Sequence, residues 1–128
     1  MTVALDKAAG LLADAHARKL RFVPFAQAHG VKDLAAAYAV QDALVARWCR
    51  AGARPVGYKV GLTSPRMQAM CGIDQPIGGV VLSGRVFQSG DSISLSRFVH
   101  AGLEFEVGMR LGRDLPAGAR PFTRDDVA

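Results

Sequence analysis

Two glutamates separated by one residue are the most informative chemical feature of this sequence. Glu104 and Glu106 are the only glutamates in the chain, and the other nine of its eleven acidic residues are aspartates. Side chains alternate between the two faces of a β-strand, so a strand over residues 102–111 would place both carboxylates on one face and apolar side chains on the other. An antiparallel strand with one face in solvent has the same pattern, and periodicity alone favours that interpretation.

A metal site is the alternative interpretation of this pair. Two like charges on one strand face repel each other, and Arg110 is the only basic residue near them in sequence that shares their predicted face. If that face turns inward, the two carboxylates cannot both stay ionised without a cation. Oxygen ligands suit Mg²⁺ or Mn²⁺ better than zinc. The residues alone therefore leave both hypotheses open for Glu104 and Glu106.

A lysine just before a predicted helix is the second candidate. Lys59 lies in the middle of a predicted strand, and this strand leads to Ser64 and Pro65, a good capping residue and a good first helical residue. A lysine beside a helix N-terminus can bind a carboxylate or a phosphate. A strand lysine whose ammonium simply reaches solvent is an equally good explanation. The glycine spacing excludes a phosphate-binding P-loop.

The remaining candidates are weaker. Residues 74–79 combine Asp, Pro and Gly, which turn chemistry explains without any function. His16 and His29 lie in the predicted helical region and are expected at the surface. His100 precedes Glu104 by four residues, so we keep it as a minor catalytic candidate because histidine titrates near neutral pH.

The elements that must position these residues change character along the chain. Apolar residues at helical spacing predict helices over residues 3–20 and 32–51. A short strand over 55–62 and a short helix from Ser64 to about Gly72 follow, and then β-branched residues predict strands over 80–86, 92–99 and 102–111. Thr123, with acids behind it, resembles another helix start. Helices followed by strands indicate an α+β fold, with a helical region at 1–53 and a strand-rich region at 54–128.

Composition narrows the class of protein. Half of the 128 residues are apolar, so the chain can form a core, and its length fits one domain or part of a larger one. No apolar run is long enough to cross a bilayer, and we recognise no signal peptide. Cys49 and Cys71 are expected to be free thiols. We therefore expect a cytoplasmic protein without a membrane partner.

The charge of +5 raises the possibility of a nucleic-acid partner. The arginines are scattered singly, however, and the chain has no basic block, no aromatic-interleaved RNA-binding segment and no zinc finger. We therefore favour a solvated surface with some affinity for anions, and no nucleic-acid partner.

A family resemblance connects the two candidate motifs. This chain resembles the 2-keto-4-pentenoate hydratases (2-hydroxypenta-2,4-dienoate hydratases) and their relatives the 4-oxalocrotonate decarboxylases, within the fumarylacetoacetate hydrolase superfamily. The resemblance covers nearly the whole chain and corresponds to the N-terminal half of the family. It rests on five segments in the family order: Ala37-Tyr-Ala-Val-Gln41, Gly57-Tyr-Lys-Val-Gly-Leu-Thr63, Asp74-Gln-Pro76, Glu104-Phe-Glu106 and Arg113-Asp-Leu-Pro116.

The resemblance implies a fold and a set of site residues. The fold is a helical N-terminal region leading into part of a mixed β-roll that holds one Mg²⁺ or Mn²⁺. Glu104 and Glu106 match the family's metal ligands, and the third acidic ligand comes from later in the family sequence than residue 128. Lys59 matches the family lysine beside the substrate carboxylate, and the neighbouring residues expected to bind substrate are Leu62, Thr63 and Ser64.

The function implied is hydration of a 2-hydroxy-2,4-dienoic acid to a 4-hydroxy-2-oxo acid, in the catabolism of aromatic compounds. A decarboxylase of the 4-oxalocrotonate type is the first alternative, because it uses the same stabilised enolate. Ile77 stands where the hydratases commonly have an acidic residue, which leaves the substrate open. The second alternative is a truncated chain without activity. We expect a small-molecule substrate and assembly as a homo-oligomer.

Overall fold

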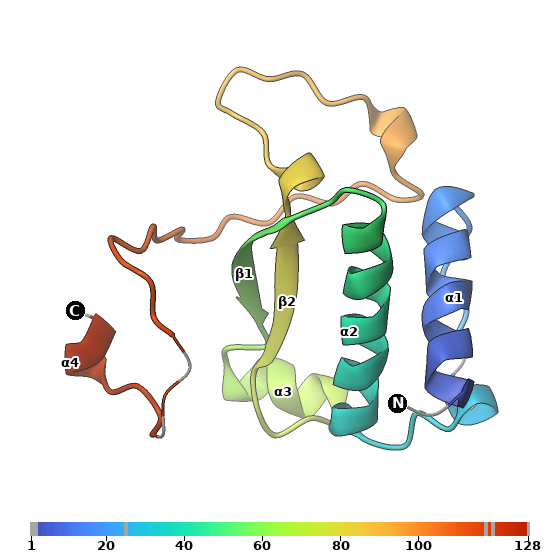
Figure 1. Cartoon of the computed structure of the whole chain (residues 1–128), viewed down its shortest axis with the longest axis horizontal. Coiled ribbons are helices and arrows are strands. Elements are labelled where there is room, and N and C mark those ends of the chain that lie inside the picture. Colours follow the sequence, from blue (N-terminus) through green and yellow to red (C-terminus); the bar gives the residue numbers. More distant parts are fainter. Residues whose placement is uncertain (1–2, 25, 117, 119, 128) are drawn as a thin grey trace.

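Two helices, a two-stranded sheet with a short helix in its connection, and a long C-terminal segment make up this computed structural model (Figure 1). It describes residues 3–24, 26–116, 118 and 120–127. The helices are α1 (Val3–Ala17), α2 (Leu34–Arg50), α3 (Pro65–Cys71) and α4 (Arg124–Val127), and the strands are β1 (Pro55–Gly61) and β2 (Ile77–Leu82). The described part of the chain is therefore α+β, as the sequence predicts.

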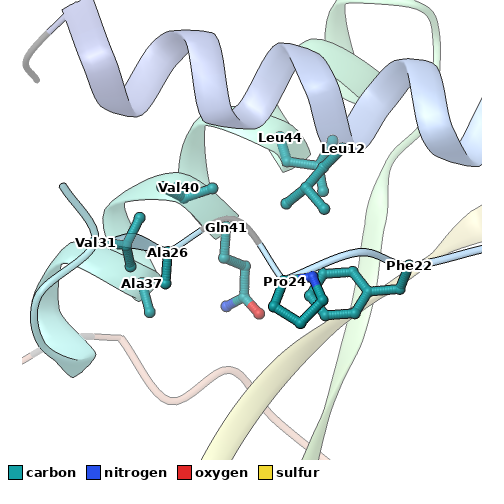
Figure 2. A pocket seen from close by; sticks show the side chains of 9 residues that line it. All are labelled: Leu12, Phe22, Pro24, Ala26, Val31, Ala37, Val40, Gln41 and Leu44. Carbon is teal, nitrogen blue, oxygen red and sulfur yellow. The ribbon is translucent and has the colours of Figure 1, made fainter. Parts of the chain in front are cut away.

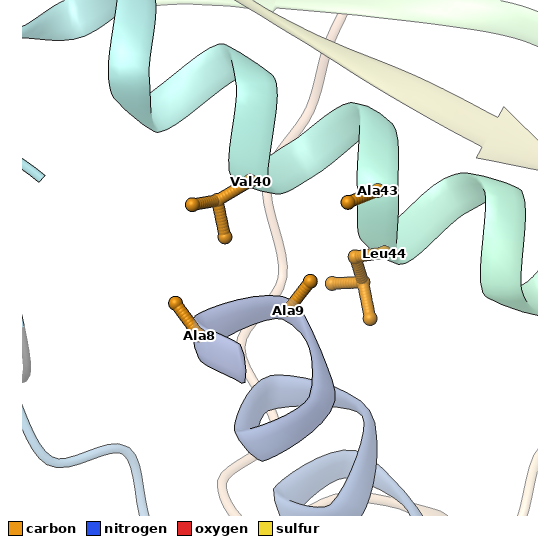
Figure 3. Packing of buried hydrophobic residues seen from close by; sticks show 5 residues of the cluster. All are labelled: Ala8, Ala9, Val40, Ala43 and Leu44. Carbon is orange, nitrogen blue, oxygen red and sulfur yellow. The ribbon is translucent and has the colours of Figure 1, made fainter. Parts of the chain in front are cut away.

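Helices α1 and α2 lie side by side, and the small core forms between them (Figures 1 and 3). Small residues allow the close approach, because Ala8 and Ala9 of α1 are fully buried. The cluster as a whole consists of Ala8, Ala9, Val40, Ala43 and Leu44. Arg47 adds a polar contact between the helices, because its Nη2 lies 2.8 Å from Asp6 Oδ1.

The ends of the helices follow their local sequence. Asp33 caps α2 by accepting a hydrogen bond from Ala36 N at 2.8 Å. Helix α1 ends at Ala17, three residues earlier than predicted, because Lys19 adopts a left-handed conformation with φ of 54°. That conformation cannot continue a right-handed helix.

The sheet is an antiparallel pair in which Lys59 of β1 stands opposite Gly79 of β2. Helix α3 lies in the connection between the strands and begins as predicted, since Ser64 Oγ accepts a hydrogen bond from Met67 N at 3.3 Å. The sheet is also joined to α2, because Gly78 N donates a 2.8 Å hydrogen bond to the hydroxyl of Tyr38. These contacts fix the position of Lys59 relative to the helical region.

Three strand predictions need correction. The strand predicted over 80–86 is β2, which begins earlier and ends at Leu82, where a 3₁₀ turn follows. The strands predicted over 92–99 and 102–111 are absent from the described structure, and the first region contains instead the 3₁₀ helix Leu95–Arg97. Residues 102–111 form no ladder with another described strand, and a strand requires such pairing.

Two further expectations concern the end of the chain and its larger architecture. The helix predicted to start after Thr123 is present as α4. The mixed β-roll stays a prediction, because the described residues form a sheet of two strands.

Both cysteines are free, as expected. No helix in the described part of the chain is both long and apolar enough to cross a membrane.

Candidate functional site

The structure brings together the three residues that the sequence ranked highest. Lys59 Nζ lies 3.4 Å from Glu106 Oε1 and 3.5 Å from Glu104 Oε2, across a sequence separation of more than forty residues. Both distances fit weak, charge-assisted hydrogen bonds. We name Lys59, Glu104 and Glu106 the lysine–carboxylate triad. Its members come from β1 and from the extended segment 102–111, which passes across the sheet (Figure 1).

The electrostatics of the triad follow from its charges. The hydrogen bond to Glu106 and its negative charge, followed by the charge and the hydrogen bond of Glu104, raise the pKa of Lys59. The ammonium form is therefore favoured at neutral pH. The site is open, since the side chains of Glu104 and Glu106 are 77% and 50% exposed. The ammonium of Lys59 offsets one of the two carboxylate charges, and both carboxylates still face solvent.

Three glycines neighbour Lys59 on its face of the sheet, although Val81 and Ile77 stand opposite two of them. Gly57 and Gly61 are its neighbours on the same face of β1, and Gly79 is its partner across the sheet. A Cβ atom at Gly79 would lie 3.5 Å from Lys59 Cγ, an ordinary van der Waals distance. Packing in this structure therefore does not require a glycine at that position. We name these three residues the glycine floor.

The predicted substrate-binding residues 62–64 form the turn from β1 to α3. Leu62 has a φ of 54°, which is uncommon for a residue with a branched side chain. Its carbonyl accepts a 2.8 Å hydrogen bond from Gln68 Nε2, which holds the turn in this shape. Thr63 is exposed, whereas the hydroxyl of Ser64 is engaged in capping α3. Gln68 is a positioning residue that sequence reasoning missed, because its role depends on the shape of the turn.

The donor set of the triad fits a hard divalent cation, but it is small. Both carboxylates already converge on one positive atom, and carboxylate oxygens are ligands that Mg²⁺ and Mn²⁺ accept. Among the described residues, no group of three or more His, Cys, Asp or Glu side chains could hold a metal ion. The described chain thus offers two carboxylates to a cation.

The other candidates lie elsewhere. His100 lines a pocket together with residues of α1. Asp74 is exposed in the turn before β2, which agrees with its interpretation as a turn former. Sequence reasoning missed an apolar pocket of about 350 Å³, which lies between the two helices and the side chains of Phe22, Pro24, Ala26 and Val31 (Figure 2). Gln41 supplies the one polar side chain among its lining residues, which do not include the triad.

Comparison with known proteins gives the family context of this geometry. The chain is 40% identical over 114 residues to the TodF product hydratase of Pseudomonas putida (strain F1), which covers 89% of this chain and 42% of that protein. It is 36% identical over 113 residues to 2-keto-4-pentenoate hydratase 2 of Dechloromonas aromatica (strain RCB). This alignment covers 88% of this chain and 43% of that protein. No protein-family model matches the chain.

A decarboxylase is also among the relatives. A 4-oxalocrotonate decarboxylase from a Pseudomonas species is 34% identical over 83 residues, which is 65% of this chain and 32% of that protein. The longest of these alignments are with proteins named as hydratases. The chain is therefore a homologue of the 2-keto-4-pentenoate hydratases, similar to them over most of its own length and spanning about two fifths of theirs.

Proposed function

We propose that this chain supplies the lysine–carboxylate triad of a divalent-metal-dependent hydratase. The reaction is addition of water to a 2-hydroxy-2,4-dienoic acid to give a 4-hydroxy-2-oxo acid. The observation that carries the proposal is the convergence of Lys59, Glu104 and Glu106 in a chain whose relatives are named hydratases. Three residues from two distant segments meet at one exposed point, where a small acid can reach them.

Glu104 and Glu106 are the residues that would hold Mg²⁺ or Mn²⁺. Such a cation supplies Lewis-acid stabilisation of the negative charge that develops on the 2-oxo oxygen of the substrate. Oxygen donors from outside the described carboxylate pair complete its coordination, because two carboxylates alone do not satisfy either ion.

Lys59 acts in this proposal as a donor to the substrate carboxylate. A lysine ammonium is protonated at neutral pH, so it serves as a fixed positive charge rather than as a general base. Leu62 and Thr63 stand beside it on the turn to α3, where the backbone of the turn is held by Gln68. Fixing the carboxylate at this end orients the conjugated chain of the substrate across the glycine floor.

Metal binding provides the first test. We expect calorimetric titration with Mn²⁺ to show binding that is lost in Glu104→Gln and in Glu106→Gln. The control is Asp42→Asn, which removes an exposed carboxylate from α2 and should leave the binding unchanged. If Mn²⁺ binds equally well to all four proteins, or to none of them, Glu104 and Glu106 are not metal ligands.

Product analysis distinguishes hydration from decarboxylation. Decarboxylation is the second candidate reaction, because one of the relatives is named a decarboxylase. The chain is incubated with Mn²⁺ and either 2-hydroxypenta-2,4-dienoate or a 2-oxo dicarboxylic acid of the oxalocrotonate type. Formation of a 4-hydroxy-2-oxo acid supports the hydratase, and release of CO₂ supports the decarboxylase. If neither product forms although Mn²⁺ is bound, the chain is inactive by itself.

A further inference from the structure

A basic pocket separate from the triad lies between the end of α1 and residues 85–100. Its volume is about 380 Å³, within the size range of small-molecule sites. Five of its lining residues are basic: His16, Lys19, Arg85, Arg97 and His100. These residues are scattered along the sequence, and the fold gathers them from the C-terminal end of α1 and from two later segments.

The lining of this basic pocket carries an unbalanced positive charge. None of the lining residues is acidic, and Lys19, Arg85 and Arg97 contribute three positive charges when the histidines are neutral. Asp14 lies nearby in sequence, but its carboxylate pairs with Arg18 at 3.2 Å. Because the pocket contains no carboxylate of its own, it favours an anion.

Aromatic rings hold the two arginines in place. The guanidinium of Arg85 lies 5.8 Å from the ring centre of Trp48, and that of Arg97 lies 5.1 Å from the ring centre of Phe87. Neither arginine forms a salt bridge with a described residue. A cation–π contact leaves N–H donors available, so both guanidinium groups can still bind a carboxylate.

Lys19 occupies a conformation that normally selects glycine. Leu20 N donates to Ala15 O at 2.9 Å and Lys19 N donates to His16 O at 3.3 Å, which is a helix end of the Schellman type with a lysine at its left-handed position. Its Nζ donates to Ser96 O at 2.8 Å, and two ammonium hydrogens remain for a ligand. Lys19 thus combines a strained backbone conformation with an ammonium that contacts a second segment. This combination indicates that the charge of Lys19 has a role.

Apolar side chains complete the lining of the pocket, among them Leu12, Phe22 and Phe98. We propose that this basic pocket binds a small organic carboxylate with an apolar body. The carboxylate is held by Lys19 and the two arginines, and the apolar body packs against the apolar lining. Inorganic phosphate would satisfy the cations but leave that lining unused, so the mixed lining favours the organic acid.

Calorimetric titration with benzoate tests this proposal, on protein and buffer freed of metal beforehand by a chelating resin, so that no metal at the triad can hold the anion. We expect saturable binding of one benzoate, no binding of benzyl alcohol and weaker binding of acetate. Lys19→Gly should weaken benzoate binding about tenfold, since one charge-assisted hydrogen bond is removed. Glycine suits the left-handed position, so this variant should fold, and its circular dichroism verifies that.

The control is Lys32→Gln, which removes an exposed lysine that does not line the pocket and should leave the affinity unchanged. Absence of benzoate binding overturns the proposal, and so does an equal affinity in Lys19→Gly. If phosphate binds more tightly than benzoate, the proposal that the ligand has an apolar body is wrong. These outcomes are independent of the hydratase proposal, because they involve neither the metal nor the triad.

Discussion

At the scale of single residues, Lys59 connects two motifs that the sequence could predict only separately. The triad has one positive and two negative charges, and each of its members is open to solvent. The sequence identified all three residues from their types and spacing. The contact between them could not be derived from periodicity, because it depends on how residues 102–111 pass across the sheet.

His16 provides a prediction about pH at this scale. Partial burial, followed by the positive charge of Arg85, lowers the pKa of His16 below its ordinary value of 6.5. Protonation is therefore less favourable in the folded state than in the unfolded state, so His16 lowers stability as pH falls below about 6.5. We expect His16→Gln to lose this part of the pH dependence.

Urea denaturation of both proteins at pH 7.5 and pH 5.0 measures the effect. The other two histidines are present in both proteins, so any contribution from them cancels in the comparison. The parent should lose more stability than His16→Gln between the two pH values. An equal loss in both would show that His16 titrates alike in the folded and unfolded states.

At the scale of elements, prediction succeeded where the signal was local. Helix α2 has apolar residues at helical spacing, and α3 has the Ser-Pro start, so both were predicted from sequence. The predicted strand over 102–111 was wrong because alternation reports which side chains share a face, whereas a strand also needs a partner. The alternating residues 103, 105, 107 and 109 are at least 90% exposed.

The contact between α1 and α2 gives a prediction about stability. Leu44 is 7% exposed and belongs to the small core between these helices. Leu44→Ala should reduce the free energy of unfolding by about 2–5 kcal/mol, because it leaves a cavity. Leu11→Ala is the matched control, since Leu11 is 46% exposed and its truncation removes little buried area.

Denaturation monitored by circular dichroism measures both variants. Typical domains have about 5–15 kcal/mol of stability, so loss of the Leu44 side chain can unfold a large fraction of this chain. Equal effects of the two substitutions would show that the helix pair contributes little to the cooperative unit.

At the scale of the whole molecule, the described chain exposes a long row of apolar side chains. Leu103, Phe105, Val107 and Met109 are 90–99% exposed, and the described residues form a sheet of two strands. Exposed apolar rows and open sheet edges favour association with another chain. This supports the expectation of a homo-oligomer, which we propose forms through residues 103–109.

Sedimentation velocity over a range of concentrations tests this association. We expect the parent chain to form dimers or larger species as concentration rises, and Phe105→Ser to shift the transition to at least several-fold higher concentration. Leu95→Ser is the control, because Leu95 is also exposed but lies outside the row. A parent chain that stays monomeric throughout would contradict the proposal.

The family context was the part of the whole-molecule prediction that succeeded best. The order of five short segments was sufficient to identify the relatives, and their names agree with the resemblance. The β-roll remains a prediction, because a sheet of many strands depends on pairings between distant segments. Side-chain periodicity within one segment contains no information about such pairings.

The glycine floor has a consequence for the shape of the molecules that the triad can accept. Gly57, Gly61 and Gly79 leave gaps around the Lys59 side chain, and Val81 and Ile77 stand opposite the first two glycines. A flat molecule can approach the backbone at these gaps, whereas a branched or puckered one meets the flanking side chains first. A conjugated dienoate is planar throughout its carbon chain, so selection by flatness would operate before any bond of the substrate changes.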